Sequence, residues 1–527
     1  MSTLRIGHAA RRAGAPGEGL GGALGLAVLA AVALVVGAAA AVVGSAAGPR
    51  SMYYVAIFSL AGLAVMLAAT RKEPLRFAFL ALIACFPLLE AEVPPGRLGL
   101  TVFNVGAILL GLGLVGKKLI NPRSSPGPVF PSASLLTAWL LLLPCVLFSR
   151  YPAHSFIAFF LIFGVYAFFL LAMEELRREN GFEHLVTLLA LVSIVFAAGL
   201  FVDSTLHLNL SMRGANVNQN TMVGGVPTWR AAGFFQDPQQ AGGFLASIVT
   251  FLLVLSVRGR FRGKPLGYLV WLAILCGLAA LTTTISRSAI IGCIVVSFAA
   301  IFAFNGWSIV TKLVIMVAVV ALAVLGLMTP WEVWLNFLPV KVVERFLDAQ
   351  TEFQDRLNIW FDTWDMFANH PLFGIGPGSF QPYLAETRPT VTYFYGIGEA
   401  EGVPYVPYQP ESGYLKILYE GGIVGSAAAL LVIGDALRRV AMVTLGRNAD
   451  PRARTECIAA LAGLIAFAVT FVTLFNLGDG RIAGIFCVFL AVIWHHSLSL
   501  SRAASPRVVK VRNGLKNDPP LGRIGTA

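Results

Sequence analysis

Apolar runs recur along almost the whole chain, and mostly short polar connections separate them. Most of these runs have about 18 or more residues, enough for an α-helix to cross roughly 30 Å of hydrocarbon. The pattern therefore predicts an all-α fold, a polytopic bundle of about fourteen transmembrane helices. We expect these helices at residues 20–46, 52–69, 75–90, 98–115, 131–148, 153–172, 184–202, 239–256, 265–283, 288–304, 309–328, 412–436, 456–476 and 481–498.

The first apolar run follows three arginines, which is also the arrangement of a secretory signal peptide. At about 27 residues, the run is longer than the apolar core of a signal peptide, which has about 7 to 15. We therefore expect a retained first helix, and a cleaved signal peptide is the alternative.

Composition supports a membrane protein. Of 527 residues, 57% are hydrophobic and 13% charged, and the mean hydropathy is +0.76. A soluble core does not need so large an apolar fraction. All six cysteines lie within apolar runs, so the sequence shows neither a disulfide framework nor the ligand spacing of a metal site.

Positive charge predicts the orientation. With a cytoplasmic N-terminus, 27 of the 39 Lys and Arg residues fall on the cytoplasmic side and 12 outside. This bias is typical of membrane proteins, so we expect both termini in the cytoplasm. The net charge of +12 therefore reflects membrane topology and does not indicate a nucleic-acid partner. We expect the basic C-terminal tail to face solvent or membrane lipid.

Two connections on the predicted outer side are long, residues 203–238 and residues 329–411. A loop of about 80 residues inside a compact bundle is usually functional. The second loop contains VVERFLDAQTEFQDRLNIWFDTWDMFANHP, whose apolar spacing predicts one or two short amphipathic helices, and then the turn HPLFGIGPGSF. We expect one membrane domain, 1–527, with the large external loop 329–411 within it.

Three arginines on this outer side are candidate functional residues. Arg230 lies in TWRAAGFFQDPQQAG, Arg287 in TTTISRSAIIG and Arg356 in FQDRLNIW. Arginines at helix ends often only reach lipid headgroups or pair with carboxylates, and this is the alternative for each. Three of them in motifs rich in Gly, Ser and Gln favour a diphosphate site, because a guanidinium matches two oxygens and stays charged.

Structural roles are the simpler interpretation of two other polar residues. Glu411 precedes an apolar run, and a carboxylate in the first turn of a helix interacts favourably with the helix dipole, which lowers its pKa and makes it a poorer base. His370 stands before a proline and is expected to cap a helix end. The glycines at 374, 376 and 378 lack the preceding strand and the Lys-Ser/Thr of a phosphate loop, so we expect a tight turn packed on the bundle.

Four motifs then occur in a fixed order: TWRAAGFFQDPQQAGGFLA, TTTISRSAIIG, DRLNIWFDTWDMFANHPLFGIGPGSF and ESGYLKILYEGGIVG. The series resembles the O-antigen ligase and O-antigen polymerase (Wzy-like) superfamily of bacterial envelope glycosyltransferases, over residues 228–425. The resemblance implies transfer of an undecaprenyl-diphosphate-linked oligosaccharide to a glycan acceptor at the outer leaflet of the bacterial inner (plasma) membrane, without a metal or other cofactor. Expected partners are membrane lipid, a chain-length regulator and a flippase.

The resemblance also implies roles for single residues. Arg230, Arg287 and Arg356 would bind the diphosphate, and fixed positive charge would stabilise its departure. The catalytic candidates are Glu411, Arg287 and Arg356, and the candidate substrate-binding residues are Arg230, Gln236, Asp237, His370, Ser412 and Tyr414.

The sequence departs from the ligase pattern at one point. Ligases usually carry a His-Asn pair before the Tyr-Leu, and here the matching residues are Glu411 and Ser412. Many polymerase-type members carry an acid at this position. A carboxylate can take a proton from a sugar hydroxyl if apolar surroundings or nearby acids raise its pKa, and residues 332–411 contain eleven acids against four basic residues.

The predicted function is therefore an inverting, metal-independent polymerase of exopolysaccharide or O-antigen. A ligase that moves a finished glycan to a lipid or a protein is the nearest alternative. A transporter or flippase of lipid-linked glycan is the alternative from another class, but it should place polar residues at mid-membrane, whereas these motifs gather on one side. A non-catalytic scaffold would leave the ordered motifs without a reason.

Overall fold

The structure is a computed structural model of the chain. It describes residues 73–89, 101–120, 128–208, 210–211, 220–223, 226–304, 308, 310, 314, 356–361, 363–387, 393–395, 403–405, 410–446 and 449–504. The expected spans 20–46 and 52–69 lie outside these residues, as does 309–328 except for residues 310 and 314.

Each of the other eleven expected spans contains a helix, which confirms the all-α membrane bundle. Eight of these helices are long and apolar enough to cross a membrane, and three are shorter. The eight are α4 (Val102–Ile120), α6 (Pro152–Leu176), α7 (Gly181–Leu206), α8 (Pro238–Val257), α9 (Pro265–Thr284), α17 (Gly413–Leu445), α18 (Pro451–Phe471) and α19 (Gly480–Ala504), and the shorter ones are α3 (Pro74–Ala84), α5 (Ala133–Leu147) and α10 (Arg287–Phe304).

Local sequence sets where several helices begin. Helices α3, α6, α8, α9 and α18 each have proline in the first turn, where its missing N–H breaks no helical hydrogen bond. The side chain of Asp237 accepts from the Gln239 N–H at the start of α8, and Ser412 accepts from the Leu415 N–H at the start of α17. Both capped starts lie in motifs that the sequence analysis singled out.

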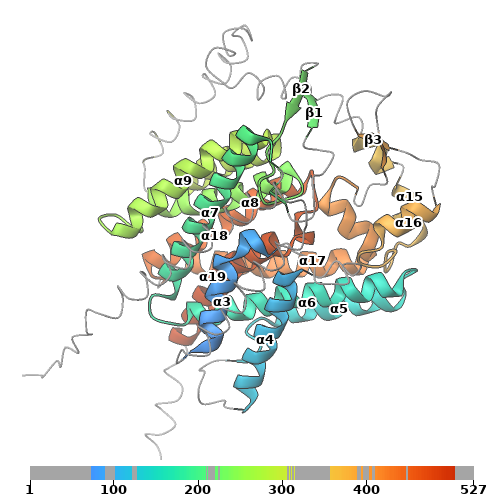
Figure 1. Cartoon of the computed structure of the whole chain (residues 1–527). Coiled ribbons are helices and arrows are strands. Elements are labelled where there is room, and N and C mark those ends of the chain that lie inside the picture. Colours follow the sequence, from blue (N-terminus) through green and yellow to red (C-terminus); the bar gives the residue numbers. More distant parts are fainter. Residues whose placement is uncertain are drawn as a thin grey trace, which may run out of the picture.

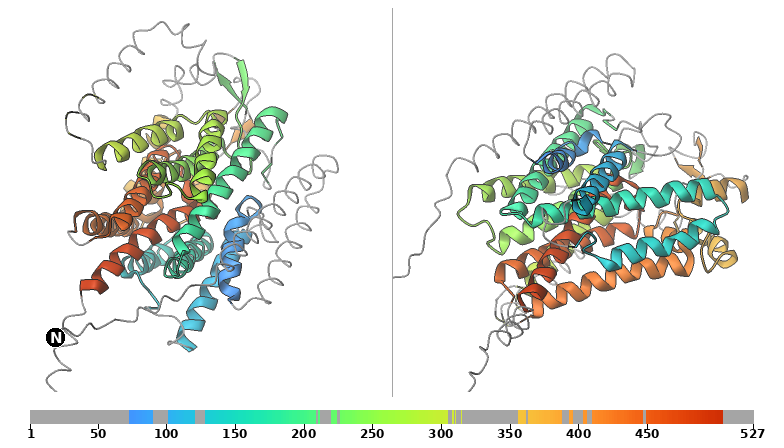
Figure 2. Two further views of the ribbon diagram at one scale, coloured as in Figure 1. Left: turned by 90° about the vertical axis from the view of Figure 1, so that its left-hand side faces the viewer. Right: turned by 90° about the horizontal axis from the view of Figure 1, so that it is seen from below.

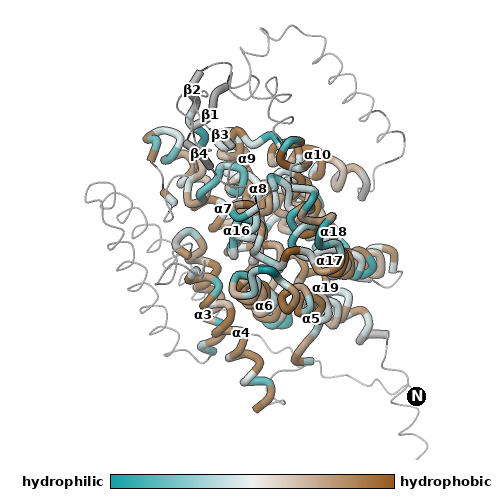
Figure 3. The backbone as a smooth tube through the Cα atoms, turned by 90° about the vertical axis from the view of Figure 1, so that its right-hand side faces the viewer, coloured by the Kyte–Doolittle hydropathy of each residue, from teal (hydrophilic) through white to brown (hydrophobic). Residues whose placement is uncertain are grey.

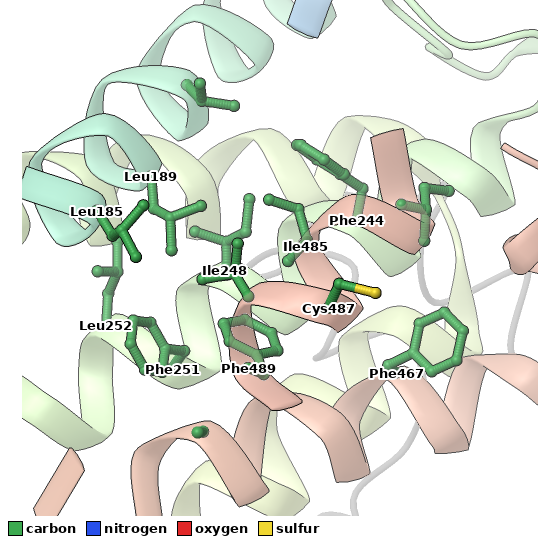
Figure 4. Packing of buried hydrophobic residues seen from close by; sticks show 14 of the residues in the cluster. Leu185, Leu189, Phe244, Ile248, Phe251, Leu252, Phe467, Ile485, Cys487 and Phe489 are labelled. Carbon is green, nitrogen blue, oxygen red and sulfur yellow. The ribbon is translucent and has the colours of Figure 1, made fainter. Parts of the chain in front are cut away.

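The core forms around α8, which packs against α7, α9, α10 and α18, while α19 packs against α6, α17 and α18 (Figure 1). Side chains from α7, α8, α18 and α19 meet there (Figure 4). A second group of neighbours consists of α5, α6 and α17, with α5 packed against both other helices (Figure 2). The core residues labelled in Figure 4 are Leu185, Leu189, Phe244, Ile248, Phe251, Leu252, Phe467, Ile485, Cys487 and Phe489.

The outer helices expose apolar side chains, as expected of surfaces that face lipid. Trp271 and Leu275 of α9, Ile294 of α10 and Leu430 of α17 are all exposed. The hydropathy colouring shows apolar stretches over the helical part of the fold (Figure 3). An apolar exterior of this kind supports a multi-pass membrane protein.

Charged residues that the sequence assigns to the cytoplasmic side form ion pairs where their helices begin or end. Each of the three cations named below contacts a carboxylate on another element, so its charge is paired within the protein. The pairs with their N–O distances are Arg76–Glu175 (2.9 Å), Lys118–Glu174 (3.0 Å) and Arg260–Glu456 (2.6 Å).

Short elements gather at the other end of the bundle. Two antiparallel hairpins, which the sequence analysis did not predict, lie there (Figure 1). In the described part of the large loop, α15 (Trp364–Asn369) and a helical stretch at 356–361 lie where short helices were expected, and a further short helix, α16 (Phe380–Thr387), follows the turn. The strands are β1 (Asn220–Val223), β2 (Val226–Trp229), β3 (Tyr393–Tyr395) and β4 (Val403–Tyr405), and the 3-10 turns are η1 (Phe86–Leu88) and η3 (Asn476–Gly478).

Candidate functional site

Three arginines that are far apart in the sequence line one polar cavity. The cavity has a volume of about 310 Å³, which includes its opening to solvent. Its wall comes from the segment before α8 and the first turn of that helix, the junction of α9 and α10, the helical stretch 356–361 and the segment after α18. The lining residues are Arg230, Gln239, Ile285, Ser286, Arg287, Ser288, Arg356 and Thr473.

Arg230 is held in the wall of this cavity and is only 4% exposed. Its Nε donates to the Thr284 carbonyl at 3.3 Å, and the next N–H, of Ala231, donates to the Thr283 carbonyl at 3.1 Å. Burial lowers the pKa of Arg230 to about 10; Arg356 and Arg287 act in the same direction, and the carboxylates of Asp237 and Glu411 oppose it. At neutral pH the guanidinium is therefore still charged.

Glu411 is buried beside these cations, at 4% exposure. Burial raises its pKa to about 7, and the carboxylate of Asp237 acts in the same direction, whereas Arg356 and Arg230 oppose both. The dipole-based expectation of a lowered pKa is therefore wrong, because desolvation outweighs it.

The interpretation of Glu411 as a first-turn residue is also wrong. Ser412 is the N-cap of α17, so Glu411 lies one position before the helix begins. Its φ of +50° is in the left-handed region, which residues other than glycine seldom adopt. Such backbone strain, of about 1–3 kcal/mol, persists where surrounding structure enforces it and is common in functional sites.

The other candidate residues fall into two groups. Asp237 is fully buried and interacts electrostatically with both Arg230 and Glu411, and Ser412 is buried next to Glu411. The Tyr414 hydroxyl instead donates to the Ala468 carbonyl at 2.9 Å. The second group consists of Tyr414, Gln236 and His370; neither these residues nor Asp237 and Ser412 are among the residues lining the cavity.

His370 has the geometry of a helix end. It follows the last residue of α15, and its N–H donates to the Phe367 carbonyl at 3.1 Å. Its ring meets the ring of Tyr383 edge-on, with centroids 6.1 Å apart. The structure therefore offers a packing role for His370 in the turn rather than a place at the cavity.

Asp203, which the sequence analysis missed, fixes the loop that carries Arg230. This carboxylate lies in the last turn of α7 and is fully buried. It accepts from Trp229 Nε1 at 3.0 Å and from the N–H groups of Ala232 and Gly233 at 2.8 Å each. The only sequence signal for it was an acid at the end of an apolar run.

Arg481 fixes the same loop from the other side. Its guanidinium is 1% exposed, pairs with Asp479 at 2.6 Å and donates to the Phe234 carbonyl at 3.0 Å. It also lies over the ring of Phe235, 4.1 Å from the centroid. Asp203 and Arg481 thus hold the residues between Arg230 and Asp237 at two points.

The turn HPLFGIGPGSF docks into a break in α17. Gly422 has φ +59° and ψ −154°, a conformation essentially restricted to glycine, so the helical hydrogen bonds are interrupted there. The turn supplies the missing partners from its own backbone, as expected for a tight turn packed on the bundle. The four bonds run from Ile375 N–H to Tyr419 O (3.0 Å), Gly376 N–H to Glu420 O (2.9 Å), Ile423 N–H to Pro371 O (2.9 Å) and Val424 N–H to Leu372 O (3.1 Å).

The side chain of Glu420 completes this joint. Its carboxylate accepts from the N–H groups of Gly378 (2.9 Å) and Phe380 (3.1 Å) at the start of α16, and it pairs with Lys416 at 3.1 Å. The segment of α17 next to Glu411 is thereby tied to the external loop.

Within the ranges that the structure describes, no group of three or more His, Cys, Asp or Glu side chains is placed to hold a metal ion. Metal independence stays a prediction from the family resemblance.

Comparison with known proteins gives a family match. The model of the O-antigen ligase family matches residues 272–430, a range that includes Arg287, Arg356 and Glu411 but not Arg230. No curated protein matches the chain. The family match confirms the resemblance to the O-antigen ligase and polymerase superfamily, whose members carry out glycosyl transfer in membranes.

Proposed function

We propose that this protein polymerises lipid-diphosphate-linked repeat units of an exopolysaccharide or O-antigen at the outer face of the bacterial inner membrane. The observation that carries the proposal is the convergence of Arg230, Arg287 and Arg356 on one cavity, with Glu411 buried beside them. Three permanent cations suit a diphosphate, and one carboxylate with a raised pKa suits a base.

The proposed reaction is a displacement at the anomeric carbon of the donor. The acceptor hydroxyl oxygen forms the new bond to this carbon, and the bond from the carbon to the diphosphate oxygen breaks. The electron pair leaves with the diphosphate, whose developing charge the arginines stabilise. Glu411 takes the proton of the acceptor hydroxyl. Attack from the side opposite the leaving group inverts the anomeric configuration.

The pKa of Glu411, about 7, supports the base role. A group that titrates near the working pH is half deprotonated and still basic enough to accept a proton in the transition state. Asp237 contributes by raising the pKa, and Arg230 and Arg356 limit the rise.

Polymerisation is preferred over ligation because Glu411 and Ser412 stand where ligases usually carry a His-Asn pair. Transfer of a finished glycan to a lipid or a protein is the second candidate, since the matched family is described as O-antigen ligase. We also propose cytoplasmic termini, based on the charge bias, and cooperation with a flippase and a chain-length regulator.

The test is to delete the gene and size the glycan that remains on the lipid carrier. Single repeat units on the carrier support polymerisation, and full-length polymer stranded there supports ligation instead. Complementation with the Arg230→Ala, Arg287→Ala, Arg356→Ala triple variant should leave the deletion phenotype unchanged. A purified triple variant that binds the lipid-linked donor as tightly as the parent would refute the diphosphate site.

A further inference from the structure

One hydroxyl in the cavity wall has no partner. Ser286 is 2% exposed, and its Oγ has no hydrogen-bond partner among the described residues. Leaving a buried hydroxyl unpaired is unfavourable, so most buried polar groups in proteins are paired. The missing hydrogen-bond partner of this hydroxyl therefore calls for an explanation. Ser286 is one of the residues that line the cavity of the three arginines.

The neighbouring hydroxyls, in contrast, have hydrogen-bond partners within the protein. Thr282, Thr283 and Thr284 each donate to the carbonyl three residues earlier, at 2.7–2.8 Å. Ser288 Oγ lies 3.0 Å from Thr473 Oγ1. Ser286 is thus distinguished within a stretch whose other hydroxyls are satisfied by the protein itself.

The backbone places Ser286 directly before α10. Ile285 has φ +50°, an outlier for a β-branched residue, and this conformation ends α9 and lets α10 begin at Arg287. Since Arg287 and Ser288 both line the cavity, the N-terminal turn of an 18-residue helix forms part of its wall. The N–H groups and the dipole at the start of a helix favour a bound anion.

Close packing on the other side holds the serine in place. A Cβ added at Gly242 of α8 would lie 2.9 Å from Ser286 Cβ and 3.2 Å from its Oγ. Glycine at this position therefore allows α8 to pack tightly on Ser286 and offers its hydroxyl no side-chain partner.

We propose that Ser286 is a phosphate-binding residue whose hydroxyl donates a hydrogen bond to a phosphoryl oxygen seated at the start of α10. This inference rests on the proposed function, because it assigns the site of one phosphate within the diphosphate. The bound oxygen supplies the partner that Ser286 lacks, and Arg230, Arg287 and Arg356 supply the charge.

A phosphate-binding role predicts that Ser286→Ala affects stability and ligand binding differently, so this substitution tests it. Ser286→Ala removes an unpaired hydroxyl, so the Tm of the ligand-free protein should stay the same or rise. Ser193→Ala is the matched control, since the Ser193 hydroxyl on α7 is also buried and without a partner among the described residues but is not among the cavity residues. Ser286→Cys, which keeps a weak donor of similar size, is the second variant.

The experiment measures binding of farnesyl diphosphate and of inorganic diphosphate to the purified full-length chain in detergent. Hydrogen bonds to charged groups are worth about 1.5–3 kcal/mol, so we expect Ser286→Ala to weaken both ligands about tenfold or more. We expect Ser286→Cys to bind both ligands more weakly than the parent and more tightly than Ser286→Ala. We expect Ser193→Ala to bind them like the parent. A loss confined to farnesyl diphosphate would point to the lipid chain and contradict a phosphate contact.

Two results would overturn the inference, and they differ in what else they refute. If Ser286→Ala binds both diphosphates like the parent while Arg230→Ala binds them weakly, the serine plays no part and the proposed function stands. If the parent binds neither diphosphate, the proposed function fails as well. A Tm of Ser286→Ala well below that of the parent would also contradict the inference, because the hydroxyl would then have a partner already.

Discussion

The raised pKa of Glu411 predicts how activity depends on pH. With a pKa of about 7, the carboxylate is half ionised at pH 7, and below this its ionised fraction falls about tenfold per pH unit. If the ionised form is the base, turnover at pH 6 should be about one tenth of that at pH 8. Glu411→Gln cannot accept a proton and should be inactive throughout this range.

The same carboxylate should make stability depend on pH with a defined sign. Its pKa in the unfolded chain is near the ordinary 4.5, so between about pH 4.5 and 7 the folded protein holds a proton that the unfolded chain has lost. The protonated carboxyl is therefore fully stabilising below pH 4.5, and this contribution is lost as the pH rises through about 7. At 1.36 kcal/mol per pKa unit, the loss is about 3 kcal/mol. Glu411→Gln should abolish this loss.

Two assays check these expectations. The first measures glycan lengthening from a lipid-linked repeat unit by the purified protein between pH 5.5 and 8.5, and the second measures Tm in detergent over the same range. Glu386→Gln is the control, because this carboxylate is half exposed and paired with Arg150 outside the cavity. Normal turnover by Glu411→Gln, or a parent rate that is flat from pH 6 to 8, would refute the base role.

Further substitutions test the supports of the site, with Tm in detergent as the common readout. Asp203→Asn leaves at least one of three buried donors unpaired and should cost about 1–3 kcal/mol and weaken donor binding, whereas Thr205→Ala in the same turn should do neither. Gly422→Ala adds a Cβ 2.6 Å from backbone atoms in a glycine-only conformation and should cost about 3 kcal/mol or more, while Gly434→Ala, with nothing within 4 Å, should change stability by less than about 1 kcal/mol. Glu420→Gln loses an acceptor at the start of α16 and should cost about 1–3 kcal/mol; an unchanged Tm would contradict the joint described for it.

Much of the fold could be predicted from the sequence because length and apolarity alone define a span. Helix α8 illustrates this: residues 239–256 were expected, and Pro238–Val257 is observed. The hairpin β1–β2 was missed, since its four-residue strands lack a clear alternation of apolar and polar residues.

The candidate site was predictable only in part. Arg230, Arg287 and Arg356 stood out as rare cations in polar motifs on one predicted side, and they meet in the cavity. Asp203 was not found, because a single acid at a helix end looks the same whether it faces solvent or holds three buried donors. From the sequence, a raised pKa of Glu411 could be predicted only if the carboxylate is buried, because burial is a property of the folded chain.

The break at Gly422 has a consequence for biosynthesis. Helix α17 has 33 residues and would span about 50 Å without the break, which is more than the roughly 30 Å of the hydrocarbon layer. Backbone groups released by the break must find partners before they meet lipid. Residues 371–376 hold those partners and precede α17 in the chain, so the ribosome delivers them first. Translation from the N-terminus therefore presents the two halves of this joint in the order that its assembly requires.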